Sequence, residues 1–245
     1  MSHKPIPILM YHSIASMPKG TIMRSLHVPP KLFKLQMWVL HIIGYQGLSM
    51  SELEPYLTGR KKGRVVGITF DDGFKNNLTN ALPILKKFGF SATCYIISQK
   101  IGGINEWDLN KGIDENPLMN ENEIKEWINS GMEIGSHSQN HVRLAECDID
   151  LATTEIEQSR VDLESQFDCS VRHFCYPYGS YNDEIVTLAK NAGYITATTV
   201  NRGRAESNTD TFSLPRVPIT HRTFVHLFLI KILSKYEDRK VRKQT

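Results

Sequence analysis

The chain has 245 residues, of which 40% are hydrophobic and 22% charged, and its formal net charge is +3. This length suits one large domain or two small ones, and the composition is that of a globular protein with its own core. The small positive charge excludes the strongly basic surface of a nucleic-acid-binding protein, but it is compatible with a neutral or acidic glycan.

No part of the sequence approaches the run of about 20 apolar residues that a membrane-spanning helix needs. The opening MSHKPIPILMYHSI has a short apolar run interrupted by prolines, and no small-residue cleavage site follows it, so it does not fit a signal peptide. We therefore expect a cytoplasmic protein, with a removed leader as the alternative.

Short apolar runs alternate with amphipathic segments along the chain. Apolar runs of four to six residues predict strands, apolar positions at helical spacing predict helices, and a capping box at Ser49 and Glu52 starts one helix. In chain order the patterns predict strand 8–11, helix 31–43, helix 49–57, strand 65–70, helix 76–88, strand 92–97, loop 101–119, helix 120–129, strand 132–135, helix 149–166, strand 171–176, helix 182–191, strand 194–199 and strand 212–217.

Strands that alternate with helices indicate a parallel sheet, either open or closed into a barrel. About seven strand–helix units favour the barrel, so we expect an α/β fold of that kind. We expect Leu35 and Ile42 to face the core from the first helix, and Leu151 and Val161 to face it from the helix at 149–166.

The C-terminal segment Thr223–Tyr236 is strongly apolar and is followed by the basic tail EDRKVRKQT. We therefore predict one domain over residues 1–222 and an apolar helix with a basic tail over 223–245. Two interpretations of this helix stay open. It packs on the barrel and ends in a solvated tail, or it lies on a membrane surface with its basic residues on anionic headgroups.

Polar residues cluster directly after four of the apolar runs. In parallel α/β folds the carboxyl ends of the strands carry the active site, because loops from different strands converge there. The clusters are His12 after ILMY, Asp71 and Asp72 after VVGITF, His137, Ser138 and His141 after MEIGS, and Pro177, Tyr178 and Gly179 after RHFCY.

The acidic and histidine clusters together predict a metal centre. His137 and His141 are four residues apart, so one helical turn brings both imidazoles to one side. Asp71 and Asp72 end a buried strand, and adjacent side chains on extended backbone point in opposite directions, so one can bind a metal while the other faces a water or an arginine. Two imidazoles and one carboxylate leave a coordination position open, which indicates metal-assisted hydrolysis of a carbonyl compound.

The segments ITFDDGF, GSHSQNH and YPYGSY, in this order and spacing, resemble the metal-dependent polysaccharide deacetylases with a NodB-type domain (carbohydrate esterase family 4). The resemblance covers about residues 6–219, and PILMYHSI is similar to the subgroup that contains poly-N-acetylglucosamine deacetylases. It implies a distorted (β/α)7 barrel that removes N-acetyl groups from an amino sugar in a polysaccharide, oligosaccharide or lipid-linked glycan and releases acetate.

The resemblance also implies roles for individual residues. Asp72, His137 and His141 match the family's metal ligands, with Zn²⁺ the first choice and Co²⁺, Ni²⁺ or Fe²⁺ as alternatives. Asp71 matches the catalytic base. Tyr178 matches the substrate-binding residue whose backbone N–H helps to hold the oxyanion.

Two positions depart from the typical family pattern. Cys175 stands where typical members carry an arginine, and the C-terminal Leu-x-His that supplies the general acid is absent from LPRVPITH. The subgroup resemblance implies that His12 takes the acid role. Two alternatives stay open: His12 is only a buried structural residue, or His221 is the acid instead. We expect Arg216 to supply the positive charge beside Asp71 and lower its pKa, or else only to close the barrel.

Trp107 lies in the 101–119 loop, where it either forms a wall on which a sugar ring stacks or anchors the loop. Two rival functions also stay open. One is a related barrel hydrolase that acts on another C–N amide bond, and the other is a catalytically impaired glycan-binding domain.

Overall fold

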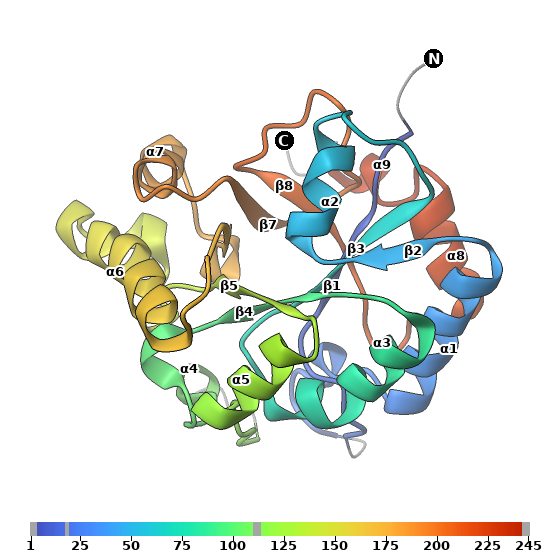
Figure 1. Cartoon of the computed structure of the whole chain (residues 1–245), viewed down its shortest axis with the longest axis horizontal. Helices are drawn as coiled ribbons and strands as arrows, with labels where there is room; N and C mark the ends of the chain where they lie inside the picture. Colours follow the sequence, from blue (N-terminus) through green and yellow to red (C-terminus); the bar gives the residue numbers. More distant parts are fainter. Residues whose placement is uncertain (1–3, 18–19, 110–113, 242–245) are drawn as a thin grey trace.

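The computed structural model describes residues 4–17, 20–109 and 114–241 of the chain. Its centre is a closed ring of seven parallel strands with helices around the outside (Figure 1). The ring closes because β1 pairs with both β3 and β8, and this confirms the predicted (β/α)7 barrel. The ring consists of β1 (Ile8–Tyr11), β3 (Val65–Phe70), β4 (Thr93–Ile96), β5 (Glu133–Ser136), β6 (His173–Cys175), β7 (Thr196–Arg202) and β8 (Leu214–Pro218).

An additional strand, β2 (Gln46–Leu48), pairs with β3 outside the ring. The sequence pattern missed it because three residues are too short to show an apolar alternation. The helices are α1 (Pro30–Ile42), α2 (Met50–Leu57), α3 (Leu82–Phe88), α4 (Glu106–Leu109), α5 (Glu121–Asn129), α6 (Ile149–Phe167), α7 (Asp183–Asn191), α8 (Val225–Leu233) and α9 (Asp238–Val241).

Two predicted segments have a more detailed structure than expected. The helix predicted at 76–88 begins as a π-helical segment, Asn77–Ala81, and continues as α3, with Pro83 in the first turn of α3. The predicted loop at 101–119 contains the short helix α4, while its residues 110–113 lie outside the described part of the chain.

The predicted inward faces of two helices were partly wrong. Leu35 and Ile42 of α1 are 41% and 55% exposed, because the buried face of this helix includes the polar Gln36. Gln36 accepts a hydrogen bond from the Tyr11 hydroxyl at 2.8 Å and donates one to the Thr223 carbonyl at 2.8 Å. A buried amide with both partners is tolerated in the core, so Gln36 occupies part of the inward face together with Phe33, Met37 and Leu40.

The same correction applies to α6. Leu151 and Val161 are exposed, whereas Glu155 and Ser159 are buried on the inward face beside Ile156. These polar residues are inside because they make hydrogen bonds there, which an apolar periodicity cannot predict.

Helix α2 lies across the amino ends of the strands and closes the base of the barrel. The Ser51 backbone N–H donates to Glu133 at 3.1 Å, and the Ser51 hydroxyl lies 3.0 Å from Nε2 of His173, whose Nδ1 is 2.8 Å from the Thr196 hydroxyl. Glu133, His173 and Thr196 begin three neighbouring strands. The polar contacts therefore bind the base of the barrel together and leave the carboxyl ends of the strands to form a site.

The C-terminal helix α8 packs on the barrel with Phe228 and Ile232 buried. Lys231 supports this packing, since its ammonium donates to the Pro218 carbonyl at 2.7 Å and pairs with Glu237 at 2.6 Å. The opposite side of the segment is apolar and exposed at Phe224, and further along the chain at Ile230 and Leu233. Among the described helices, none combines the length and the apolar character needed to cross a bilayer.

The interior of the barrel leaves no room for a side chain at Gly135 in β5. A Cβ atom there would lie 2.5 Å from the Tyr95 ring and 2.8 Å from the His173 carbonyl oxygen. We expect Gly135→Ala to lower the free energy of unfolding by about 1–3 kcal/mol, because the neighbouring strands must shift.

Urea unfolding followed by circular dichroism measures this change. Ser207→Ala, in the exposed turn after β7, is the control and should stay within about 0.5 kcal/mol of the parent. An unchanged unfolding midpoint for Gly135→Ala would contradict the close packing of this strand.

Candidate active site

A cavity of about 330 Å³ opens at the carboxyl ends of the barrel strands. It collects most of the residues that the sequence singled out, from loops that follow different strands, as a parallel barrel requires. Its lining is made of His12, Met23, Leu26, Asp71, Asp72, Trp107, Asp108, His137, His141, Arg143, Tyr176, Tyr178 and Val200.

Three of these residues form a compact set of metal ligands. Oδ1 of Asp72 is 3.4 Å from Nε2 of His137 and 3.4 Å from Nε2 of His141. All three side chains are buried, and their ligand atoms lie within 4.8 Å of one another. Two ligand atoms bound to Zn²⁺ at about 2.1 Å and a tetrahedral angle are about 3.4 Å apart, so the set fits a divalent metal of that size.

The protonation of His137 also suits metal binding. Its Nδ1 lies 2.7 Å from the backbone carbonyl oxygen of Cys175. A carbonyl only accepts hydrogen bonds, so Nδ1 carries the proton and Nε2 keeps its lone pair on the side of Asp72. This contact orients the ring before any metal binds.

Strained backbone is concentrated at this site. In the described part of the chain, four of the six non-glycine residues with positive φ belong to it: Asp72 at 74°, Ser138 at 63°, His141 at 61° and Tyr178 at 58°. Such conformations cost free energy and persist where surrounding contacts hold them. One such contact is the Ser138 hydroxyl, which accepts a hydrogen bond from the His141 backbone N–H at 3.0 Å.

The second carboxylate, Asp71, points to a different partner. Both of its oxygens accept hydrogen bonds from the Arg216 guanidinium, at 2.6 and 2.7 Å, and both side chains are buried. Arg216 also donates to the Thr199 carbonyl at 2.8 Å and to Sγ of Cys175 at 3.3 Å. Burial alone would raise the pKa of Asp71, but the adjacent guanidinium outweighs it and the pKa lies below its ordinary value.

The two candidate acids are in different places. His12 lines the cavity, and its Nε2 is 3.8 Å from Oδ2 of Asp71. The Asn77 side chain, in the π-helical segment, holds the His12 backbone carbonyl at 2.8 Å. His221 is not among the described residues of the cavity wall; burial and the charges of Arg24 and Arg222 lower its pKa.

Aromatic rings enclose His141, one of the three residues that could hold a metal ion. The Trp107 ring lies 4.5 Å from the His141 ring at an interplanar angle of 36°, and the Tyr178 ring lies 4.5 Å from it at 61°. Trp107 therefore fixes the orientation of a ligand as well as forming part of the cavity wall. The Arg143 guanidinium, which also lines the cavity, lies 4.4 Å from the centre of the Tyr178 ring.

The sequence did not single out Glu155, a buried carboxylate on α6 that supports the histidine loop. It accepts hydrogen bonds from the backbone N–H groups of Gln139 and Asn140, at 2.9 and 2.8 Å, and one from the Asn140 side chain at 2.7 Å. The only signal in the sequence was a glutamate directly before Ile156 on an inward helix face. Its partners lie 15 and 16 residues away, so helical spacing could not identify them.

Similarity to known proteins agrees with this geometry. A family model described as polysaccharide deacetylase matches residues 58–197. The Bacillus subtilis protein YxkH, which carries the name of the same family, is 34% identical over 217 residues, which is 88% of this chain and 71% of the relative. The chain belongs to the polysaccharide deacetylase family.

Two further relatives agree with the subgroup that the sequence resembles. A poly-β-1,6-N-acetyl-D-glucosamine N-deacetylase of Staphylococcus epidermidis is 25% identical, over 89% of this chain and 75% of the relative. The structure of the Streptococcus pyogenes deacetylase PplD in complex with acetate superposes with a TM-score of 0.81 at 30% identity, over 94% of this chain and 99% of PplD. The chain is thus a carbohydrate deacetylase, a hydrolase of a C–N amide bond from a metal-dependent family, as its motifs implied.

The ligand set predicts that each histidine is needed for metal binding. We expect His137→Ala and His141→Ala to lose most of the bound metal, because two ligands hold a divalent ion far more weakly than three. Elemental analysis after dialysis against Zn²⁺ measures the metal-to-protein ratio. His41→Ala, on the exposed side of α1, is the control and should keep the parent ratio. Full metal content in either site variant would show that the ion binds elsewhere.

Proposed function

We propose that this deacetylase hydrolyses the acetamide group of N-acetylated amino sugars in a glycan, with Asp72, His137 and His141 holding Zn²⁺. The single observation that carries the proposal is the different pairing of two adjacent buried carboxylates. Asp72 faces two imidazoles, whereas Asp71 is bound through both oxygens by Arg216. One carboxylate thus serves the metal, and the other stays ionised at the edge of the same cavity.

A divalent cation held by Asp72, His137 and His141 would polarise the acetamide carbonyl and lower the pKa of a water molecule at the site. Asp71 accepts the proton of the attacking water, which it can do because it lines the cavity and is held as a carboxylate. The Arg216 guanidinium keeps this carboxylate in place. It fills the role of the arginine that Cys175 replaces, although it comes from β8 rather than from the end of β6.

The remaining steps use groups from two other loops. The backbone N–H of Tyr178 is the proposed donor to the developing oxyanion, and this role is supported by the position of Tyr178 in the cavity wall and by its left-handed backbone in the Pro177–Gly179 turn. His12 then donates a proton to the amine nitrogen as the C–N bond breaks. The products are acetate and a free amino sugar. The rings of Trp107 and Tyr178 form the wall against which the sugar lies.

Asp71→Asn tests the assignment of the base. We expect this variant to keep its metal but to release acetate about 10²–10⁴-fold more slowly from N-acetylglucosamine oligomers, since the amide cannot accept the proton. Metal content and melting temperature are measured on the same preparation. Asp183→Asn, on the first turn of α7, is the matched control and should retain full activity.

Full activity of Asp71→Asn would overturn the mechanism. A parent protein that binds metal but releases no acetate from any N-acetylated sugar would overturn the function. Such a protein would be a hydrolase of another C–N bond or a glycan-binding domain.

The acid role is tested by a pair of histidine variants. We expect His12→Ala to lower kcat for acetate release by about 10²–10⁴-fold, because the departing amine loses its proton donor. His221→Ala should leave kcat unchanged, since His221 does not line the cavity. The opposite pattern would transfer the acid role to His221 and would require its loop to move to the site.

A further inference from the structure

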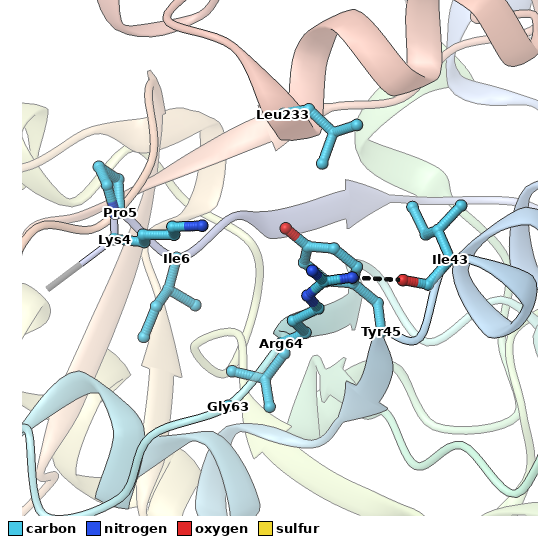
Figure 2. A pocket seen from close by; sticks show the side chains of 9 residues that line it. Lys4, Pro5, Ile6, Ile43, Tyr45, Gly63, Arg64 and Leu233 are labelled. Atoms are coloured by element: carbon cyan, nitrogen blue, oxygen red, sulfur yellow. Dashed lines mark hydrogen bonds between the residues drawn. The ribbon is translucent and has the colours of Figure 1, made fainter.

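A second cavity, of about 300 Å³, lies at the end of the barrel opposite the active site, where β1 and β3 begin and α8 ends (Figure 2). It is separate from the catalytic machinery, because no residue of its wall belongs to the active-site cavity. The main residues of the wall are Lys4, Ile6, Ile43, Tyr45, Arg64 and Leu233.

The charge of this cavity is positive. Lys4 and Arg64 line it, and no acidic residue is found among the described residues of its wall. Arg64 donates to the Ile43 carbonyl at 3.2 Å, a neutral acceptor that leaves its charge uncompensated. Within residues 4–17, 20–109 and 114–241, no carboxylate forms an ion pair with either cation. Figure 2 shows the Lys4 ammonium and the Tyr45 hydroxyl reaching into the same space.

Exposed apolar side chains lie in the wall of this positive cavity and on the two helices, α1 and α8, that end beside it. Leu233, in its wall, is 52% exposed, and Ile230, one turn earlier on α8, is 45% exposed. Helix α1 runs beside α8 (Figure 1), and its last residue Ile42, next to the wall residue Ile43, is 55% exposed. Leu233, Ile230 and Ile42 are called the apolar rim below. Apolar side chains around a basic cavity are complementary to the interface of an anionic bilayer, where phosphate lies above acyl chains.

We propose that the base of the barrel docks on anionic phospholipid membranes, with a headgroup phosphate in the Lys4–Arg64 cavity and the apolar rim at the acyl boundary. Lys61 and Lys62, exposed in the turn before Arg64, add positive charge on the same side. The active site then faces away from the bilayer, because it lies at the opposite ends of the same strands. Of the segment Thr223–Tyr236, only the outward side of α8 takes part, since Phe228 and Ile232 pack on the barrel.

Vesicle flotation of the purified full chain tests the proposal. We expect binding to vesicles of phosphatidylcholine mixed with phosphatidylglycerol and none to phosphatidylcholine alone. Raising the ionic strength from about 0.1 M to about 1 M should release the protein, since the screening length falls from about 10 Å to about 3 Å. Equal binding to both kinds of vesicle, or no binding to the anionic ones, would overturn the proposal.

Two variants locate the contact. Arg64→Glu should lower the partition coefficient onto anionic vesicles about fivefold or more. The loss of one cation at such a surface by itself lowers it about fivefold. Leu233→Ser should also weaken it, by removing an apolar anchor. Lys190→Glu, on α7 at the other side of the barrel (Figure 1), replaces one cation by a carboxylate just as Arg64→Glu does. This control should bind like the parent. If Arg64→Glu does not fold, as judged by its melting temperature, Lys4→Glu takes its place.

All these variants should release acetate from soluble oligosaccharides at the parent rate, so the docking is tested independently of the proposed function. Unchanged vesicle binding by both Arg64→Glu and Leu233→Ser would overturn the proposal. A rise in melting temperature with glycerol phosphate but no vesicle binding would show a site for a small soluble anion instead. A dimer that Leu233→Ser converts to monomer, again without vesicle binding, would show that a second copy of the chain covers this surface.

Discussion

The buried ion pair between Asp71 and Arg216 is the interaction on which both the barrel and the site depend. It joins the end of β3 to β8 across β1, the strand that closes the ring. The same guanidinium contacts the Thr199 carbonyl in β7 and the thiol of Cys175 at the end of β6. Removing either partner would leave an uncompensated buried charge, at a cost of about 3–5 kcal/mol. The carboxylate that we propose as the catalytic base is thereby held by one of the central contacts of the fold.

Around this pair, the strained segments of the site are held by buried polar groups rather than by apolar packing. Ser138 and Glu155 bind the backbone of the histidine loop, and the Cys175 carbonyl sets the tautomer of His137. Each of these contacts fixes a ligand or its loop before a metal arrives. A rigid, preorganised ligand set binds its ion without first paying an ordering cost, and it keeps Asp72 and Asp71 directed to different partners.

The two ends of the barrel have opposite characters. The carboxyl ends of the strands carry carboxylates, imidazoles and aromatic rings around one cavity. The amino ends are closed by α2 through Ser51, Glu133 and His173, and beside this closure lie the Lys4–Arg64 cavity and the apolar rim. Because the strands are parallel, a surface at one end necessarily points away from a site at the other. This polarity suits an enzyme that works on a glycan while resting on a lipid surface.

The sequence by itself determined the strands, the family motifs and the grouping of the polar clusters, because buried parallel strands are short continuous apolar runs and their carboxyl ends must converge. It did not predict β2, which is too short for a pattern, or the inward faces of α1 and α6, where Gln36 and Glu155 are buried. For Arg216, 145 residues from Asp71, and for His12 against His221, the sequence supplied an expectation from the family resemblance and left alternatives open. Only the tertiary structure decided that Arg216 pairs with Asp71 and that His12 lines the cavity. Periodicity reports where water is excluded, whereas a buried polar residue depends on a partner that only the closed barrel brings within hydrogen-bonding distance.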